Sequence, residues 1–335
     1  MGKLHFQCAR ALHKDVNVVA AADAKRSNQK AAKKYKVKVY DDYKKLIDSE
    51  DLDAIVLSLP NFLRKESITY AAEKGLAIFV DKPLARNLRE AEEITKIVNT
   101  KNVSLTVGAN YRYFESVQKM RNILEEGRVG DVVIGTSELI MDGPFSHSLV
   151  PRPVPDWWLD KEKSGGGALL DLGYHLIDLF TWMLGSVEIE YSSLGYRYGL
   201  PTEDSATVVL KSPETNTRCT VNVGWFSKMI FPNFNFRVNL HGTVGYVSTD
   251  HFAPKNLYLY AAKEGVLNFL RKISGRPIHH LSYTYYYASF AEILNRFFEA
   301  AKNEEEPPVS LEEQVAVIKI IDSIYKQNEV SNCPT

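Results

Sequence analysis

The sequence of 335 residues has few cysteines, no long apolar run and no excess of charge of either sign. Its three cysteines, Cys8, Cys219 and Cys333, are too few and too scattered for a disulfide framework or a zinc site. No run of about 18 apolar residues offers a membrane span. No secretory leader pattern opens the chain. We therefore expect a protein of the reducing cytoplasm, with no membrane partner and no metal.

The charge balance argues against nucleic acid as a partner. Lysine and arginine number 41, aspartate and glutamate also number 41, and the formal net charge is zero. A nucleic-acid-binding domain normally carries a basic surface, and this balance supplies none. The length and the 45% hydrophobic content allow two domains with a large core. Small neutral or mildly charged molecules are the expected partners.

The two parts of the chain show different patterns. Residues 1–108 alternate apolar strands with helices, which predicts a Rossmann-like α/β domain with a parallel sheet. Residues 109–335 carry long β-rich runs, which predict an α+β domain with a large, mostly antiparallel open sheet. The open face of that sheet could pack against another subunit in a homodimer or homotetramer. The predicted strands are residues 18–22, 54–59, 76–80, 103–107, 132–140, 205–210, 218–225 and 234–241. The predicted helices are residues 27–36, 66–74, 87–99 and 311–325.

One apolar helical segment carries three ionisable side chains. Asp171, His175 and Asp178 are spaced so that they share one face of a helix. Burying them costs several kcal/mol unless each finds a partner, so the segment indicates a site or a tightly satisfied polar network. Glycines at 165–167 precede it, and their lack of side chains would let the backbone approach a flat ligand closely.

A second segment places a lysine at the end of a buried strand. The apolar residues 76–80 lead directly into Asp81, Lys82 and Pro83. In open α/β sheets, ligands bind at the carboxyl ends of the strands, so Lys82 is predicted to point into the crevice. An ordinary surface lysine is the alternative.

Together these segments resemble the Gfo/Idh/MocA family of NAD(P)-dependent oxidoreductases, over nearly the whole chain. The family's Glu-Lys-Pro motif appears as residues 81–83, its Gly-Gly-x-x-x-Asp-x-Gly-x-His motif as residues 166–175, and its Asn-x-Arg segment as residues 110–112. Residues 203–206 and 241–245 resemble the family's sheet and glycine-turn signatures, and they come after the other motifs in the same order as in the family. The resemblance implies that Lys82, Asp171 and His175 form the reacting centre. It also implies that Asp81 and Pro83 lie near the cofactor, and that the 311–325 helix packs back towards the first domain.

The start of the chain departs from the family pattern. A dinucleotide-binding fold opens with an apolar strand and a Gly-x-Gly-x-x-Gly loop, of which neither the strand nor the first two glycines is present. Leu4, Cys8 and Leu12 repeat at helical spacing, so Gly2 is predicted to open a helix. Gly2 also precedes Asp23 by about the 20 residues expected between the loop and the ribose-binding acid. We interpret Gly2 as the last glycine of the loop and expect about a dozen residues to precede Met1.

The residues after the first visible strand bear on the cofactor. A carboxylate at Asp23 would accept hydrogen bonds from the adenosine ribose and repel a 2′-phosphate, which favours NAD. Lys25 and Arg26 could instead hold that phosphate, so NADP remains possible.

The resemblance implies further contacts. Pro60 and Asn61 correspond to the family's cofactor loop. Four residues after Pro60 many members carry histidine, whereas this chain has Arg64, to which we assign no role. The residues expected near the substrate are Asn110, Arg112, Trp158 and Gly166.

Hydride transfer from a secondary alcohol requires a base for the hydroxyl proton and positive charge near the oxygen. His175 can be the base near neutral pH, and Lys82 can supply the charge. Asp171 could orient the substrate or hold the imidazole. Tyr174 is an alternative proton carrier, although its ordinary pKa near 10 makes it a poorer base. We expect Asp178 to be structural, bonded to a backbone group or an arginine.

We therefore predict an NAD(P)-dependent oxidoreductase of a sugar, cyclitol or related polyol. One alternative is a non-catalytic dinucleotide-binding sensor or regulatory protein of the same fold. A base beside a lysine argues against it, because a pure binder needs neither. The other alternative is a reductase of a non-sugar carbonyl or imine, which a mainly apolar pocket would favour.

Overall fold

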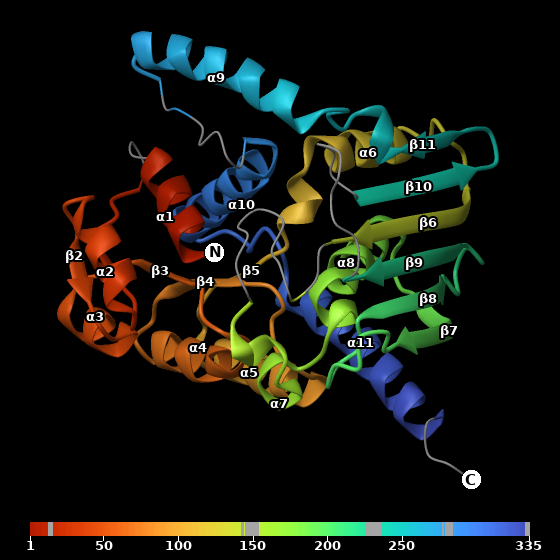
Figure 1. Ribbon diagram of the computed structural model, residues 1–335, viewed down its shortest axis with the longest axis horizontal. Helices are drawn as coiled ribbons and strands as arrows, with labels where there is room; N and C mark the ends of the chain where they lie inside the picture. Colours follow the sequence, from red (N-terminus) through yellow and green to blue (C-terminus); the bar gives the residue numbers. More distant parts are fainter. Residues whose placement is uncertain are drawn as a thin grey trace.

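The computed structural model describes residues 1–12, 16–141, 144, 154–225, 236–276, 278 and 284–331. Figure 1 shows two parts side by side, short parallel strands among helices in one and a broad sheet in the other. Within the described residues, no helix is both long and apolar enough to cross a membrane.

The N-terminal part has short parallel strands between helices, as predicted. β1 pairs with β2, and β3, β4 and β5 form a separate three-stranded sheet, with every pairing parallel. The strands are β1 (Ala20–Ala22), β2 (Lys38–Tyr40), β3 (Ala54–Leu57), β4 (Ala77–Asp81) and β5 (Leu105–Gly108). The helices are α1 (Gly2–Ala11), α2 (Arg26–Lys33), α3 (Tyr43–Ser49), α4 (Arg64–Glu73) and α5 (Leu88–Lys101). The helix predicted to begin at Gly2 is α1.

Local capping sets the limits of α5. The Asn87 side chain accepts a hydrogen bond from the backbone N–H of Glu90, which satisfies one of the free donors of the first turn. The helix ends at Asn102, whose φ of 50° lies in the left-handed region that asparagine tolerates. These caps place β5 directly after the helix, so that its carboxyl end lies beside that of β4.

The C-terminal part is built on a six-stranded sheet in the order β11-β10-β6-β9-β8-β7. All its neighbours are antiparallel except β6 and β9, which confirms the mostly antiparallel open sheet. The strands are β6 (Val132–Ile140), β7 (Glu188–Gly195), β8 (Ser205–Lys211), β9 (Arg218–Gly224), β10 (Phe236–Gly242) and β11 (Tyr246–Ser248). Along β8 the buried Ala206, Val208 and Leu210 alternate with more exposed residues, so that one face is apolar and the other polar.

The helices of this part are α6 (Glu115–Glu125), α7 (Lys161–Ser164), α8 (Tyr174–Leu184), α9 (Leu257–Ile273), α10 (Thr284–Asn303) and α11 (Leu311–Ser331). Of these, α6, α8 and α11 pack against the sheet, and α10 and α11 pack against the N-terminal part. A π-helical turn, Leu169–Gly173, leads into α8, and 3-10 turns lie at Asn61–Leu63, Asn110–Tyr113, Asp156–Trp158 and Thr249–His251.

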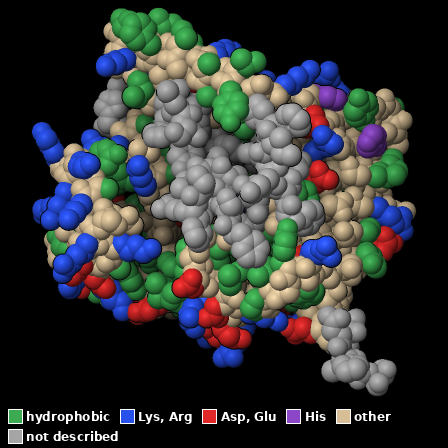
Figure 2. All heavy atoms as spheres, viewed as in Figure 1, with side chains coloured by type: hydrophobic (Ala, Val, Ile, Leu, Met, Phe, Trp, Pro, Cys, Tyr) green, Lys and Arg blue, Asp and Glu red, His purple; other side chains and the backbone are tan. Residues whose placement is uncertain are grey.

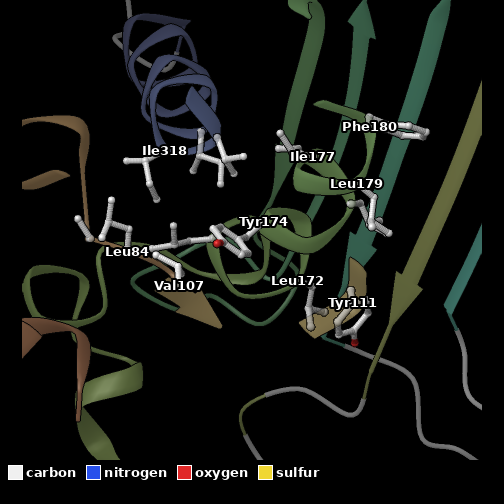
Figure 3. Packing of buried hydrophobic residues seen from close by; sticks show 14 of the residues in the cluster. Leu84, Val107, Tyr111, Leu172, Tyr174, Ile177, Leu179, Phe180 and Ile318 are labelled. Atoms are coloured by element: carbon white, nitrogen blue, oxygen red, sulfur yellow. The ribbon is translucent and has the colours of Figure 1, made fainter. Parts of the chain in front are cut away.

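One hydrophobic cluster runs through both parts. Figure 3 shows Tyr174 and Ile177 of α8 between Leu84 and Val107 on one side and the sheet on the other, with Ile318 of α11 above them. All five side chains are almost completely buried. This shared core holds the carboxyl ends of β4 and β5 against the start of α8, where the candidate site lies.

Candidate active site

Lys82 and Asp171 form an ion pair where β4 ends. The Lys82 Nζ lies 2.8 Å from the Asp171 Oδ1 and 2.6 Å from the Asp171 carbonyl oxygen. The two side chains are 22% and 25% exposed, so the pair is partly accessible. An ammonium group has three N–H donors, and these contacts use two of them. The structure thus brings together two of the three residues predicted to form the reacting centre.

Arg64 anchors the backbone on which Lys82 stands. Its guanidinium donates to the carbonyl oxygen of Lys82 at 2.9 Å and to that of Pro83. The side chain is 4% exposed, and this burial lowers its pKa to about 10, which leaves it protonated at neutral pH. These contacts could not be predicted from the sequence, because a departure from a family pattern does not reveal the partners of the new residue.

Asp171 makes its second contact with an aromatic side chain. The Trp225 Nε1 donates to the Asp171 Oδ2 at 3.2 Å, so the carboxylate is engaged by Lys82 and Trp225. Those contacts contradict the interpretation in which Asp171 holds the imidazole. Trp158 stacks on Trp225 with ring centroids 6.2 Å apart, which forms an aromatic wall beside the carboxylate. Trp225 was missed, although its place at the end of a predicted strand was a usable signal.

His175 lies one turn further along α8 and is 5% exposed. Its ring stacks on Tyr111 at 3.8 Å with an interplanar angle of 18°. Its Nδ1 is buried with no hydrogen-bond partner among the described residues. Burial, and then the positive charge of Lys82, hold the pKa of His175 well below its ordinary value, so the imidazole is neutral at neutral pH. Of residues 110–112, the predicted Asn-x-Arg segment, Tyr111 is the one that contacts His175.

Arg112 and Asp178 form a buried ion pair away from the site. The Arg112 Nε and Nη2 donate to the two Asp178 oxygens at 2.9 and 2.7 Å, and both side chains are 1% exposed. Gln314 also donates to Asp178, and Arg112 also donates to Glu313. The structural role predicted for Asp178 is confirmed. The expected substrate contact of Arg112 is contradicted, because a buried guanidinium needs these partners and has no accessible surface to offer.

Two other predicted residues also face the interior. The Asn110 side chain is 3% exposed and donates to the Ser289 hydroxyl on α10 at 3.0 Å, so its expected contact with substrate stays a prediction. Tyr174 is fully buried and donates its hydroxyl to Gln314. Burial raises the pKa of Tyr174 well above its ordinary value, so it does not serve as the proton carrier.

Protein groups, not a flat ligand, account for the glycine run. A Cβ at Gly166 would collide with the Tyr325 ring of α11, and one at Gly167 would collide with the backbone of Glu203. The Glu203 Oε1 accepts hydrogen bonds from the N–H groups of Gly167 and Leu169 and from the Tyr325 hydroxyl, at 3.0, 2.9 and 2.8 Å. The interpretation of Gly166 as a floor for substrate is corrected accordingly: its missing side chain makes room for α11.

The residues predicted to hold the adenosine half of a dinucleotide lie at the start of α1 and between β1 and α2. Gly2 opens α1, and a Cβ added to it would lie 3.5 Å from the Cβ of Ser58, whose hydroxyl is buried without a partner in the described part of the chain. Asp23 follows β1, and its carboxylate accepts the backbone N–H of Lys25 at 2.8 Å. Arg26 is the first residue of α2 and is exposed. A helix N-terminus beside an unsatisfied hydroxyl fits a phosphate-bearing ligand.

Two further cofactor-side predictions have protein partners instead. Asn61 is 9% exposed and donates to the carbonyl oxygen of Ser164 at 2.7 Å, next to the glycine run. Asp81 is also 9% exposed, and its Oδ1 lies 2.6 Å from the Nε2 of His5 on α1. The Asn61 amide nitrogen and the Asp81 Oδ1 are thus occupied within the protein, and the predicted contacts of these residues with a cofactor stay predictions. Pro60 begins the turn that carries Asn61.

No cluster of histidine, cysteine, aspartate and glutamate suited to a metal ion occurs in the part of the chain that the structure describes.

Comparison with known proteins places these features in a family. Residues 1–109 match the oxidoreductase family with an NAD-binding Rossmann fold, and residues 117–248 match the GFO/IDH/MocA C-terminal domain. The uncharacterized oxidoreductase YrbE of Bacillus subtilis is 28% identical over 313 residues, which cover 92% of this chain and 85% of that protein. Trans-1,2-dihydrobenzene-1,2-diol dehydrogenase of Mus musculus is 25% identical over 315 residues, covering 93% and 88%.

A solved structure gives the same fold. The WlbA dehydrogenase of Bordetella pertussis, in complex with NADH and UDP-GlcNAcA, superposes with a TM-score of 0.79 at 18% identity and covers 100% of this chain and 95% of that one. At this identity the likeness concerns the fold alone. The matches to both domains, in the order found in the chain, show that this protein belongs to the Gfo/Idh/MocA family of NAD-binding oxidoreductases.

Proposed function

We propose that the protein interconverts a secondary alcohol and its ketone on a sugar, cyclitol or related polyol, with NAD as the hydride carrier. Residues 1–108 would bind the cofactor and residues 109–335 the substrate. The observation that carries the proposal is the partly exposed ion pair of Lys82 and Asp171, whose lysine helps to lower the pKa of the neutral His175 imidazole. These groups supply a cation and a base within one site, which is what alcohol oxidation requires.

His175 would move the hydroxyl proton. Its lowered pKa keeps the ring neutral, so it can accept the proton of an alcohol or, once protonated, return it to a ketone oxygen. Because its Nδ1 is buried, the Nε2 remains for substrate. Stacking on Tyr111 holds the ring plane, which limits the orientations that the accepting nitrogen samples.

Lys82 would stabilise the substrate oxygen. Two of its three N–H donors are directed to Asp171, which leaves the third for the oxygen on which negative charge develops. Asp171 is a positioning residue in this scheme, since its carboxylate and carbonyl hold the ammonium in place. The backbone contact of Arg64 with Lys82 limits movement at the base of the same side chain.

The nicotinamide, when bound, accepts a hydride from the alcohol carbon or delivers one to the carbonyl carbon. The N-terminus of α1 at Gly2, with the unsatisfied Ser58 hydroxyl, would bind phosphate. Asp23 stands after β1, where a carboxylate disfavours a 2′-phosphate. This arrangement supports NAD over NADP, although Lys25 and Arg26 supply the positive charge that NADP would need.

The partly exposed Trp158, which stacks on the buried Trp225, supports a cyclic substrate. Aromatic rings beside polar groups suit a ligand with one apolar face and several hydroxyls, such as a sugar or cyclitol ring. The names of two similar proteins agree with this class, since one acts on a cyclic diol and the other is bound to a nucleotide sugar.

The polar face of the six-stranded sheet supports a homo-oligomer. This face carries half-exposed threonine and asparagine side chains and exposed apolar ones such as Ile134 and Tyr246. No helix packs against it in the described residues, so a second copy could cover it in a homodimer or homotetramer.

The test is turnover of inositols, aldoses and cyclic diols with NAD⁺ or NADP⁺, followed by nicotinamide absorbance. The variants Lys82→Met and His175→Asn are expected to lose roughly 10²–10⁴-fold in kcat while still binding NADH. Lys96→Met, which removes an exposed lysine on α5, is the control and keeps full activity. NADH binding without turnover of any substrate would refute the proposal and favour a sensor. Turnover only of non-sugar ketones or imines would favour the reductase.

A further inference from the structure

Helix α9 turns its polar side chains inward and its apolar side chains outward. On the inner side, the Arg271 Nη1 donates to Glu264 at 2.7 Å and to Asn268 at 2.9 Å, and Glu264 and Asn268 are buried. The outer side carries six large apolar residues that are 53–75% exposed, called here the apolar strip: Tyr258, Leu259, Val266, Phe269, Leu270 and Ile273. A helix that faces water shows the opposite arrangement.

The apolar strip is continuous. At 3.6 residues per turn its members span about 120° of the helix circumference, and the exposed Ala262 lies between them. Figure 2 shows hydrophobic side chains gathered along the top of the molecule, where Figure 1 places α9. Taking about 150–250 Å² for each large side chain and the exposed fractions, the strip offers roughly 700 Å². This exceeds the largest apolar patch of a typical monomer, about 300–600 Å², so the strip is an interaction surface.

We propose that the apolar strip binds the same strip of a second copy of this chain, with the two α9 helices antiparallel across a two-fold axis. A two-fold contact uses one patch twice, so an uncharged apolar strip is complementary to itself. Each copy would contribute roughly 700 Å², close to the roughly 800 Å² per partner of a standard stable interface.

The charges beside the strip agree with this pairing. Lys263 and Lys272 lie on opposite margins of the strip. In an antiparallel pair centred on Val266, Lys263 of each copy stands near Phe269 of the other, so the lysines avoid one another and each cation meets an aromatic ring.

A lipid surface fits the helix less well. A helix that lies on a membrane carries its basic residues on a polar face that remains in contact with water and lipid headgroups. On α9 the polar face packs into the protein, and its Arg271 is already paired with Glu264. The chain as a whole has no net positive charge to attract anionic lipid.

The α9 contact is distinct from the sheet. The strip lies on α9, whereas the polar face belongs to the six-stranded sheet β6–β11, so one copy can use both surfaces at once. Two different two-fold contacts on one chain generate a closed tetramer when their axes intersect at right angles. The proposal does not depend on the identity of the substrate.

The test is the molar mass of the full chain by light scattering after size exclusion. Val266→Glu places two carboxylates at the axis and is expected to halve the mass, with NADH binding unchanged. Lys96→Glu, an exposed substitution on α5, is the control and keeps the wild-type mass. Phe269→Ser provides a second disruption if the glutamate variant fails to fold.

A cross-link gives a positive readout. The cysteines that the structure describes, Cys8 and Cys219, are buried, so Val266→Cys adds an accessible thiol at the proposed axis. Cys333 lies outside the described residues, so both proteins also carry Cys333→Ser. A short bismaleimide is expected to join two copies of Val266→Cys/Cys333→Ser and not of Cys333→Ser alone. Any of three results would overturn the proposal. The wild type could be a monomer, Val266→Glu could leave the molar mass unchanged, or the protein could bind phosphatidylserine vesicles through Val266 without self-association.

Discussion

Replacing Glu203 by glutamine is expected to stabilise the protein in neutral and alkaline solution and to have little effect in mild acid. Glu203 is 2% exposed, and its Oε1 accepts two backbone N–H groups and the Tyr325 hydroxyl. Burial raises the pKa of this carboxyl from an ordinary 4.5 to about 7, against the opposing effect of those hydrogen bonds. The folded protein therefore keeps a proton that the unfolded chain has already released.

The sign and size follow from that difference. Because the folded state binds more protons between about pH 4.5 and pH 7, the free energy of unfolding falls as the pH rises through this window. The proton on Glu203 adds about 3 kcal/mol to the free energy of unfolding. This stabilisation is fully present below the pKa of the carboxyl in the unfolded chain and is lost above its pKa in the folded protein. Glutamine keeps the accepting oxygen without the charge, so Glu203→Gln removes the loss.

Thermal unfolding of the wild type and Glu203→Gln, measured from about pH 5 to about pH 8, provides the assay. For a chain of this length, about 3 kcal/mol corresponds to a difference in Tm of about 5 °C, which should open as the pH rises. Glu305→Gln, at an exposed position, is the control and should follow the wild type. A Tm difference between Glu203→Gln and wild type that stays constant over this range would refute the reasoning.

Three further outcomes follow from the buried polar groups. Arg112→Met leaves Asp178 without its cation and should lower the free energy of unfolding by urea by about 3–5 kcal/mol. The double variant Arg112→Met/Asp178→Leu should recover most of that loss. Equal stability of the single variant and wild type would contradict this. His5→Phe keeps the ring packing but leaves Asp81 unpaired, so this variant should have a lower Tm than wild type. Adding Asp81→Asn should recover part of the loss. No change in Tm would show that the pair does not stabilise the fold. Because the pKa of His175 is lowered, kcat/KM should stay constant down to well below pH 6.5, and an acidic fall centred at pH 6.5 or above would contradict its role as the base.

Some elements with a long, clear pattern could be predicted from the sequence, whereas β7, α9 and α10 were not predicted despite their length. The strand predicted at residues 132–140 is β6, because nine residues rich in β-branched side chains leave little ambiguity of period. The strands at Lys38–Tyr40 and Tyr246–Ser248 were not predicted, because three residues are too few to show alternation. Their strand conformation depends on partners that one sequence does not reveal.

The site was predicted in its location but not in its pairings. Ionisable residues in apolar segments drew attention to Lys82 and Asp171, and the structure joins them. The spacing of Asp171 and His175 suggested that they share a helical face and contact each other. The π-helical turn Leu169–Gly173 changes the rotation per residue at that point, and Asp171 contacts Lys82 and Trp225 instead. A local widening of the helix leaves no periodic trace in a sequence.

Two ion pairs formed from the same helical segment show why pairing alone does not identify a reacting group. Lys82 with Asp171 and Arg112 with Asp178 each join residues far apart in the chain, and each satisfies a carboxylate that the sequence marks as costly to bury. They differ in exposure, at 22% and 25% for the first pair and 1% for both members of the second. A pair closed to solvent uses its hydrogen-bonding capacity within the protein and can only stabilise the fold. The partly open pair keeps a donor for another molecule, and for this reason we assign the chemistry to Lys82 and not to Arg112.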